Sequence, residues 1–284
     1  MSRFAYVSPV RWGDLDAQAH VNNGAFLDHL QDARVAYLLS QPDPVGRMLD
    51  TGVLVAAHQV EYVAPVTYTG RPLHVDLWVD AVGASRFVIG YEVRDGDTLC
   101  VRARTVATPY DLAGDALRRL TEVEREALRA SLAPAEPLRP LPSTRVGEHP
   151  HRFPLTVRWS DLDAYGHVNN VRYYDYVQEA RIAVMTSTLD WSDGVVWFVV
   201  RQDVDYLAPL DFRREPYEVA TSVVALGTRS FTLAAEVRDP GSGTVYARAR
   251  TVAVGREPLS DVEREALSAW ALPGEGAAGI SGST

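Results

Sequence analysis

The sequence contains an internal repeat, and this repeat limits what the chain can fold into more than any other feature. Arg11–Ala36 and Arg158–Ala183, offset by 147 residues, are identical at 15 of 26 positions. Shorter matches follow in the same order in both halves: Val60–Pro65 with Val204–Pro209, Glu92–Asp95 with Glu236–Asp239, Arg102–Ala107 with Arg248–Ala253, and Glu122–Leu128 with Asp261–Leu267. The sequence therefore predicts two homologous domains that follow each other along the chain.

The boundary between these domains is expected in the segment 133–151, which contains five prolines. Proline prevents a continuous helix or a central strand, so this segment predicts a surface linker. The first domain then covers residues 1–132 and the second covers residues 152–272. The last residues, 273–284, are rich in Gly, Ser and Ala and are expected to form a flexible tail.

Each copy predicts one long helix followed by a run of strands. Phe26, Leu30, Ala33 and Tyr37 are spaced as one face of a helix over residues 24–40, and the same pattern predicts a helix over residues 171–187. The strands are expected at 53–63, 73–82, 87–94 and 99–107, and again at 195–206, 217–224, 231–238 and 245–254. A long helix before an antiparallel sheet indicates an α+β fold in which the sheet wraps the helix.

The residue types that are missing exclude several kinds of chemistry. All 28 basic residues are Arg, so no Schiff-base lysine and no phosphate-binding lysine of a P-loop is present. The single Cys100 excludes internal disulfides and multi-cysteine metal sites. The histidines that differ between the copies have no ligand spacing. We therefore expect neither a metal site nor a cofactor.

Charge and hydropathy limit the partners and the compartment. The net charge of −9 argues against non-specific binding to nucleic acid, which requires a basic surface. No apolar run is long enough to span a membrane, and residues 1–14 contain no apolar stretch typical of a signal peptide. Together with the free cysteine, these features favour a cytoplasmic location.

A dense polar cluster, Asp-Leu-Asp-x-x-x-His-Val-Asn-Asn, precedes the helix in each copy. Its members are Asp14, Asp16, His20, Asn22 and Asn23 in the first copy, and Asp161, Asp163, His167, Asn169 and Asn170 in the second. A helix N-terminus carries partial positive charge and can hold an oxyanion while a carboxylate attacks or activates water. A single Asn or Asp here would be an ordinary helix cap, but a cap needs only one side chain. The cluster therefore favours a catalytic site.

The second cluster, Asp161–Asn170 followed by Tyr173-x-x-Tyr176, resembles the thioesterase signature of the hotdog superfamily. It is similar to the 4-hydroxybenzoyl-CoA thioesterase-like branch and to plant-type acyl-ACP thioesterases. The resemblance covers both repeats and implies a double hotdog, in which each domain is a long helix wrapped by a curved antiparallel sheet. Hotdogs pair so that sites form between them, and double hotdogs could assemble further into homo-oligomers.

The resemblance implies that the chain is an acyl-CoA thioesterase, which hydrolyses a small-molecule acyl thioester to the free acid and CoA. An acyl-ACP thioesterase is one alternative, although an acidic carrier protein would require a basic patch and the chain is acidic. A non-catalytic hotdog protein that binds acyl-CoA is the other alternative.

The resemblance also assigns roles within the cluster. Asp16 and Asp163 would act as nucleophile or general base toward the thioester carbonyl. The remaining polar residues of the motif would orient water, the carboxylate or the thioester oxygen: His20, Asn22, Asn23, His167, Asn169 and Asn170. The amides of the first helical residues, around 23–25 and 170–172, would polarise the carbonyl. The second copy matches the motif better, because the first has Gln18-Ala19 in place of Tyr165-Gly166.

Two equivalent loops between strands are candidates for holding the carrier. They contain Ser85 and Arg86 in the first copy and Arg229 and Ser230 in the second, and the resemblance places such a loop near CoA. An Arg guanidinium suits phosphate because it can donate two parallel hydrogen bonds. Tyr173 is a further candidate for substrate contact. The simpler interpretation of each loop is a hairpin with a solvated Arg.

Overall fold

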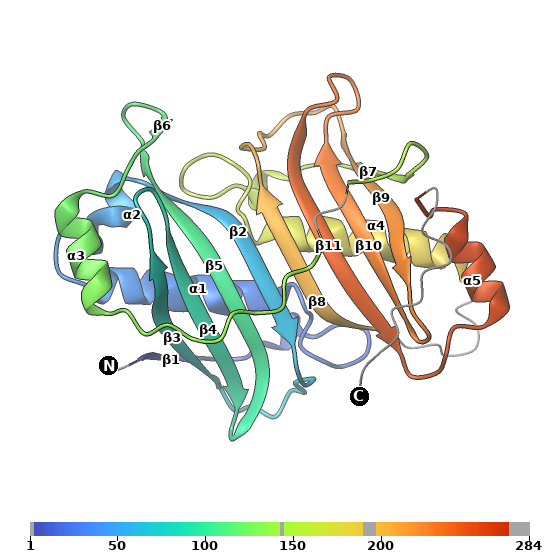
Figure 1. Ribbon diagram of the computed structural model, residues 1–284, viewed down its shortest axis with the longest axis horizontal. Coiled ribbons are helices and arrows are strands. Elements are labelled where there is room, and N and C mark those ends of the chain that lie inside the picture. The colour runs from blue at the N-terminus through green and yellow to red at the C-terminus, as the bar shows by residue number, and fades with distance from the viewer. Residues whose placement is uncertain (1–2, 143–144, 190–196, 273–284) are drawn as a thin grey trace. The chain divides into compact units, whose positions relative to one another are not determined.

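The computed structural model describes residues 3–142, 145–189 and 197–272. The chain divides into two units, Met1–Arg139 and Pro140–Thr284, which are coloured blue to green and green to red in Figure 1. The division falls inside the proline-rich segment 133–151. The tail predicted at 273–284 lies outside the described residues.

The first unit places one long helix against an antiparallel sheet. Its helices are α1 (Ala25–Ser40), α2 (Met48–Thr51) and α3 (Glu122–Ala130), and short 3-10 turns cover Trp12–Asp14 and Val45–Arg47. Its strands are β1 (Phe4–Ser8), β2 (Val53–Tyr62), β3 (Leu73–Val82), β4 (Phe87–Asp95), β5 (Thr98–Asp111) and β6 (Ala116–Leu117). The sheet order is β1-β3-β4-β5-β2, and β6 pairs with the end of β5.

The second unit repeats this design. Its helices are α4 (Arg172–Thr188) and α5 (Asp261–Ser268), and a 3-10 turn covers Trp159–Asp161. Its strands are β7 (His151–Leu155), β8 (Trp197–Tyr206), β9 (Tyr217–Leu226), β10 (Ser230–Arg238) and β11 (Val245–Gly255). The order β7-β9-β10-β11-β8 is the order of the first unit, so the repeated sequence is also a repeated topology.

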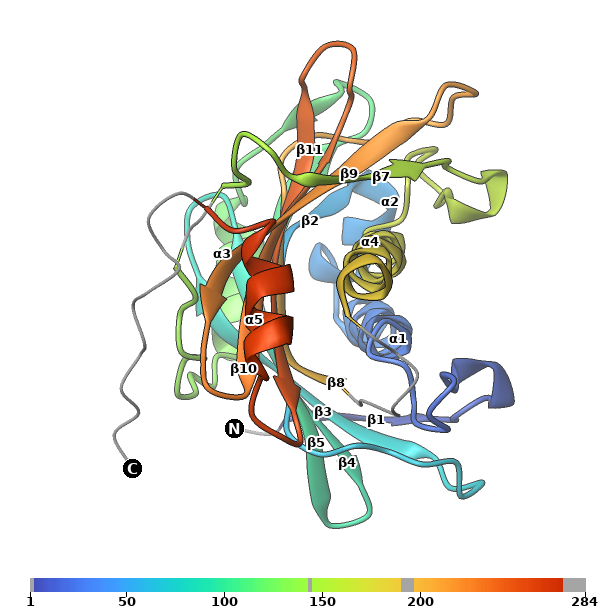
Figure 2. The same cartoon turned by 90° about the vertical axis from the view of Figure 1, so that its right-hand side faces the viewer.

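The apolar face of each long helix packs onto its own sheet. In α1 the four residues of the predicted face are buried: Phe26, Leu30, Ala33 and Tyr37. In α4 the equivalent residues are buried: Tyr173, Val177, Ala180 and Val184. Figure 2 shows α1 and α4 each lying on one face of the sheet of its own unit. These features confirm the predicted α+β fold with a helix wrapped by an antiparallel sheet.

The differences between predicted and observed elements lie mainly at their ends. Strand β5 extends to Asp111 because β6 pairs with its last residues. The short helix α2 and strand β6 have too few residues for a periodic pattern, and the sequence did not predict them. The strand expected from residue 195 is described from Trp197, since 195 and 196 lie outside the described residues.

Each unit closes with a short helix that begins at a capping box. The Thr121 hydroxyl accepts a hydrogen bond from the Glu124 amide at 3.2 Å, and the Glu124 carboxylate accepts one from the Thr121 amide at 2.7 Å. Ser260 and Glu263 make the same reciprocal pair. Both capping boxes therefore satisfy amides that a helix end leaves unpaired.

A cross-strand pair shows how the two sheets have diverged. Trp78 on β3 lies opposite Gly90 on β4, and a Cβ atom at position 90 would lie 2.5 Å from the indole ring. The second sheet has Ser222 opposite Ala234 at the equivalent place. The indole ring of Trp78 therefore fits in the first sheet because Gly90 opposite it has no side chain.

We predict that Gly90→Ala destabilises the protein by roughly 1–3 kcal/mol, because the added methyl group overpacks the indole ring. The double variant Trp78→Ser/Gly90→Ala copies the second unit and should recover part of this loss. Gly13→Ala is the matched control, since a Cβ there meets nothing within 4 Å. Urea unfolding measures all three, and an unchanged midpoint for Gly90→Ala would contradict the packing argument.

Candidate active site

The polar cluster of each copy forms a loop between the first strand and the long helix. The loop docks on the segment that follows β2 or β8. The Val21 amide donates to the Val66 carbonyl at 2.8 Å, and the Val168 amide donates to the Leu210 carbonyl at 2.9 Å. The loop therefore lies at the end of the sheet where β3 or β9 begins, next to the start of the helix.

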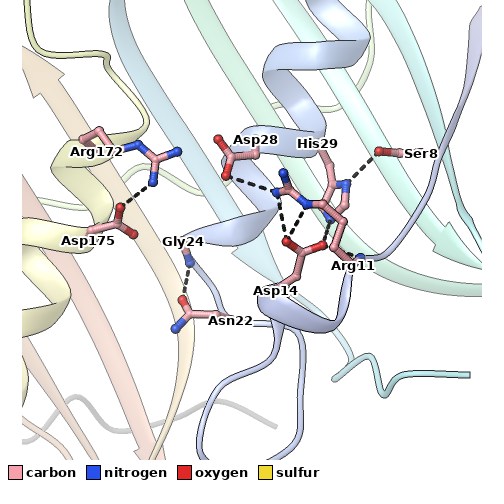
Figure 3. A network of polar contacts seen from close by, with 9 residues as sticks. All are labelled: Ser8, Arg11, Asp14, Asn22, Gly24, Asp28, His29, Arg172 and Asp175. Atoms are coloured by element: carbon pink, nitrogen blue, oxygen red, sulfur yellow. Dashed lines mark hydrogen bonds and ion pairs between the residues drawn. The ribbon is translucent and has the colours of Figure 1, made fainter. Parts of the chain in front are cut away.

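The first Asp of each motif is buried and holds the loop together. Only 4% of Asp14 and 2% of Asp161 is exposed. The Asp14 carboxylate accepts the Arg11 amide at 2.7 Å and the Arg11 Nε at 2.9 Å, as Figure 3 shows. The Asn22 amide donates to the Asp14 carbonyl at 2.7 Å. This residue therefore ties both ends of the loop and has a structural role.

The second copy closes its loop with the same bonds. The Arg158 amide donates to Asp161 Oδ2 at 2.8 Å, and the Asn169 amide donates to the Asp161 carbonyl at 2.8 Å. Asp14 and Asp161 were expected in the cluster without a separate role. Arg11 and Arg158 were not expected there, although both copies have Arg three positions before the Asp, which was an available signal.

The second Asp of each motif is only half-buried, and it uses one carboxylate oxygen to shape the turn. Asp16 Oδ1 accepts the amides of Gln18 at 2.8 Å and His20 at 3.2 Å. Asp163 Oδ1 accepts the Tyr165 amide at 2.8 Å. Within the described residues, no hydrogen bond reaches the other oxygen of either carboxylate. Each loop therefore fixes the carboxylate by one oxygen and leaves the other available to water or a carbonyl carbon.

The same turn explains a departure of the first copy from the motif. Gly166 has a φ of +83°, a conformation that glycine adopts without strain. Ala19 takes the equivalent position with a φ of 59°. An L-residue in this left-handed region is strained, so the first copy keeps the turn at a cost in stability.

The first Asn of each pair closes the turn that leads into the long helix. Asn22 Oδ1 accepts the Gly24 amide at 2.8 Å (Figure 3). The Asn22 carbonyl accepts the Ala25 amide at 3.0 Å. Asn169 makes the equivalent bonds to the amides of Val171 at 3.1 Å and Arg172 at 2.9 Å. Four of the amides expected to polarise the substrate carbonyl, those of residues 24, 25, 171 and 172, are therefore bonded within the turn, and the role of the expected amides stays a prediction.

The second Asn of each pair is held by a tyrosine from the sheet. The Tyr62 hydroxyl donates to the Asn23 carbonyl at 2.7 Å, and the Tyr206 hydroxyl donates to the Asn170 carbonyl at 2.7 Å. No role was expected for these tyrosines from the sequence. Their signal was the Tyr-x-Ala-Pro segment that occurs in both copies.

The motif histidines lie at the rim of each loop and are partly buried. The main chain of His20 forms an isolated antiparallel β-bridge with that of Thr67, in the segment that follows β2. His167 Nε2 lies 3.8 Å from Asp211 Oδ1, and the Asp211 side chain is largely exposed. The structure therefore brings together the Asp, His and Asn residues that the sequence predicted, within one loop of each unit.

The aromatic surroundings of the two loops differ. Tyr173 packs its buried ring against Tyr206, with ring centroids 5.1 Å apart. Burial, assisted by neighbouring tyrosines and by the carboxylates of Asp211 and Asp163, raises the pKa of Tyr173, so its hydroxyl stays protonated. The first copy has Phe26 at this position. The second site therefore contains a hydroxyl that the first lacks.

The candidate carrier-binding residues lie far from the loops of their own units. Ser85 and Arg86 are exposed in the β3–β4 turn, and at the equivalent place Arg229 lies in the β9–β10 turn and Ser230 begins β10. The polar loop follows Ser8, which pairs with Leu73 at the opposite end of β3. A strand of this length spans about 30 Å. The structure therefore does not bring these residues to the Asp of the same unit, and their role stays a prediction.

No group of three or more metal-binding side chains that could hold an ion occurs in the described part of the chain. Among the described helices, none has both the length and the apolar character needed to cross a membrane.

Comparison with known proteins shows what this chain is similar to. A family model described as the thioesterase-like superfamily matches residues 10–136 and 157–257. The chloroplastic palmitoyl-acyl carrier protein thioesterase of Arabidopsis thaliana is 33% identical over 126 residues, which are 39% of this chain and 29% of that protein. The match thus spans less than a third of that relative's length.

Two solved structures resemble nearly the whole chain. A Lactobacillus plantarum protein assigned as an oleoyl thioesterase aligns with a TM-score of 0.73 and 12% identity, over 89% of this chain and 96% of that one. The 12:0-ACP thioesterase of Umbellularia californica aligns with a TM-score of 0.66 and 17% identity, over 89% and 98%. At these identities the likeness shows the fold, which is the predicted pair of tandem hotdog domains.

We predict that Ala19→Gly stabilises the protein by about 0.5–1 kcal/mol and that Gly166→Ala destabilises it by about 1 kcal/mol, since only glycine adopts this φ without strain. Ala17→Gly, in the same loop but without a positive φ, is the control and should not stabilise. Thermal and urea unfolding report the differences. A stabilising Gly166→Ala would contradict the strain argument.

Proposed function

Because this chain belongs to the thioesterase-like superfamily, we propose that it hydrolyses a fatty acyl thioester carried by acyl carrier protein. At the coarser level the chain is a thioester hydrolase. The observation that carries the proposal is the half-buried carboxylate of Asp163, and of Asp16, with one oxygen held by the turn and the other available.

The proposed reaction breaks the bond between the acyl carbon and sulfur. The available oxygen of Asp163 either takes a proton from water as the water attacks, or attacks the carbonyl carbon itself before water completes the hydrolysis. In both cases water supplies the second oxygen of the free acid, and the carrier leaves as a thiol. The proposed role of Asp16 in the first copy is the same.

The surroundings of the carboxylate support this chemistry. The long helix begins immediately after the loop, and the partial positive charge at its N-terminus favours the oxyanion that forms on the carbonyl oxygen. Because the amides of residues 24–25 and 171–172 bond to Asn22 and Asn169, this support is electrostatic rather than a direct hydrogen bond. His20, His167, Asn23 and Asn170 are the proposed groups that orient water or the thioester.

The identity of the carrier is supported by the relatives. The Arabidopsis and Umbellularia proteins are both named for acyl carrier protein substrates. Acyl-CoA is the second candidate, because the net charge of −9 disfavours an acidic carrier protein. In either case Ser85, Arg86, Arg229 and Ser230 are proposed to contact the carrier or its phosphate, and Tyr173 to contact the acyl group.

The carrier is tested by presenting one acyl chain on acyl carrier protein and on CoA and measuring thiol release. We expect kcat/KM to be at least about tenfold higher on acyl carrier protein, which corresponds to about 1.4 kcal/mol. A higher value on CoA would contradict the choice of carrier. Tight binding without release of thiol on either carrier would contradict hydrolysis and favour a non-catalytic binding protein.

The carboxylates are tested by substitution to Asn, which keeps the Oδ1 acceptor that shapes the turn. Asp16→Asn/Asp163→Asn should lower kcat by about 10²–10⁴-fold without a loss of stability. Each single variant reports the share of turnover that depends on one copy. Asp50→Asn, which changes an exposed carboxylate outside the loops, is the control. Full activity in the double variant would contradict the site assignment.

A further inference from the structure

The two copies hold their buried carboxylate with different side chains. In the second copy the Tyr176 hydroxyl donates to Asp161 Oδ2 at 2.7 Å. The first copy has His29 at the equivalent position (Figure 3). Its Nδ1 lies 2.7 Å from Ser8 Oγ, and its Nε2 lies 3.6 Å from Asp14 Oδ2, too far for a hydrogen bond, with no hydrogen-bond partner among the described residues. The second copy has Leu155 in place of Ser8. The buried neighbour of the carboxylate is therefore a hydroxyl that hydrogen-bonds it in one copy, and an imidazole that is held by Ser8 and packs beside it in the other.

This support reaches the candidate catalytic carboxylate through the loop. Asp14 ties the main chain at Arg11 and Asn22, and Asp16 lies two residues beyond it inside the closed turn. The Asp14 carboxylate bonds Arg11 and the Asp14 carbonyl bonds the Asn22 amide, so a shift of the whole residue moves both ends of the segment that carries Asp16. Neither His29 nor Tyr176 hydrogen-bonds Asp16 or Asp163, so each can act only through the first Asp of its motif.

The two supports respond differently to acid. His29 is 3% exposed, and its burial lowers the pKa of the imidazole. The charged groups that face it are Asp14 and Arg11 from the loop and Asp28 and Asp32 from α1, and the hydroxyl of Ser8 faces it from β1. The three carboxylates favour the imidazolium and Arg11 opposes it, but desolvation is the largest effect. The closed arrangement therefore holds a neutral imidazole.

The direction of the acid effect follows from linkage. An imidazole that leaves the interior regains an ordinary pKa near 6.5, above that of the buried group. The opened loop then binds the proton more tightly than the closed loop, so the closed arrangement is fully stable above about pH 6.5 and weakens as the pH falls below it. In the second copy, burial and the Asp161 carboxylate raise the pKa of Tyr176, so its hydroxyl keeps its proton throughout this range.

We propose that His29 and Tyr176 are the positioning residues of the two candidate sites, acting on Asp16 and Asp163 through the buried Asp14 and Asp161, and that only the first copy opens in acid. This inference rests on the proposed function for the roles of Asp16 and Asp163. Whether each loop stays closed is a structural property, and it can be measured without measuring turnover.

Hydrogen exchange of the full chain between pH 7 and pH 5 tests the proposal. The Asn22 amide donates to the Asp14 carbonyl and the Asn169 amide donates to the Asp161 carbonyl, so these two amides report the closing of each loop. After correction for intrinsic rates, we expect the protection of Asn22 to fall by about tenfold relative to Asn169, because only the first loop gains a proton on opening. Equal acid dependence of the two amides would overturn the proposal.

The chain itself supplies the matched variants. Ser8→Leu/His29→Tyr copies the second unit into the first and should make the protection of Asn22 as insensitive to acid as that of Asn169. Tyr176→Phe removes the hydroxyl and should lower the protection of Asn169 at every pH, without creating an acid dependence. An acid-sensitive Asn22 in the double variant would overturn the assignment to His29. The wild-type comparison decides the proposal even if a variant does not fold.

Turnover gives a separate readout that distinguishes this proposal from the proposed function. In an Asp163→Asn background, kcat should fall between pH 7 and pH 5 to the extent that the exchange of Asn22 shows the closed loop to lose population, and Ser8→Leu/His29→Tyr should remove that part of the fall while KM changes little. Failure of the proposed function appears as full activity in the Asp16→Asn/Asp163→Asn variant, whatever the exchange shows. Failure of the positioning proposal appears as equal exchange in the two loops.

Discussion

The candidate site depends on the hydrogen bonds that a buried Asp makes in the turn before each long helix. Burying a carboxylate costs stability unless it is paired and hydrogen-bonded. Asp14 meets this condition through the amide and the guanidinium of Arg11, and Asp161 through the amide of Arg158 and the hydroxyl of Tyr176. The closed turn then carries the next Asp of the motif to a fixed place at the start of the helix. The first Asp supplies structure, and the second is left with an available oxygen.

The duplication makes the chain its own comparison. Some positions that are the same in both copies make the same bonds, as Asn22 and Asn169 do in the turn before each long helix. Positions that differ show where one copy can change without loss of the fold. Phe26 takes the place of Tyr173 beside the loop. His29 takes the place of Tyr176 beside the buried carboxylate. The two candidate sites therefore share a backbone and differ in the chemistry that surrounds it.

Much of this structure could be predicted from the sequence, because periodicity and repetition report local geometry. The buried face of α1, the capping box at Thr121 and the grouping of Asp16 with His20 follow from spacing along the chain. The strand order repeats because the sequence repeats. Each of these features depends on residues that are close in sequence or that occur twice.

The remaining features depend on contacts between distant residues. The sequence could not tell which Asp of the motif is buried, because that depends on how the loop docks on the segment after β2. It could not show that the amides of Gly24 and Ala25 donate hydrogen bonds to Asn22, because the start of a helix does not by itself determine which acceptors its first amides find. Nor could it place Arg86 at the opposite end of β3 from the loop, because that depends on the register with β1.

The most direct test of this account is a crystal structure with a hydrolysis-resistant substrate analogue, in which a methylene group replaces the thioester sulfur. The account predicts that the carbonyl carbon, or a water beside it, lies within about 3 Å of the available oxygen of Asp16 or Asp163. It also predicts that Asp14 and Asp161 remain buried and out of contact with the analogue. A carbonyl bound away from both Asp16 and Asp163, with their carboxylates unchanged, would contradict it.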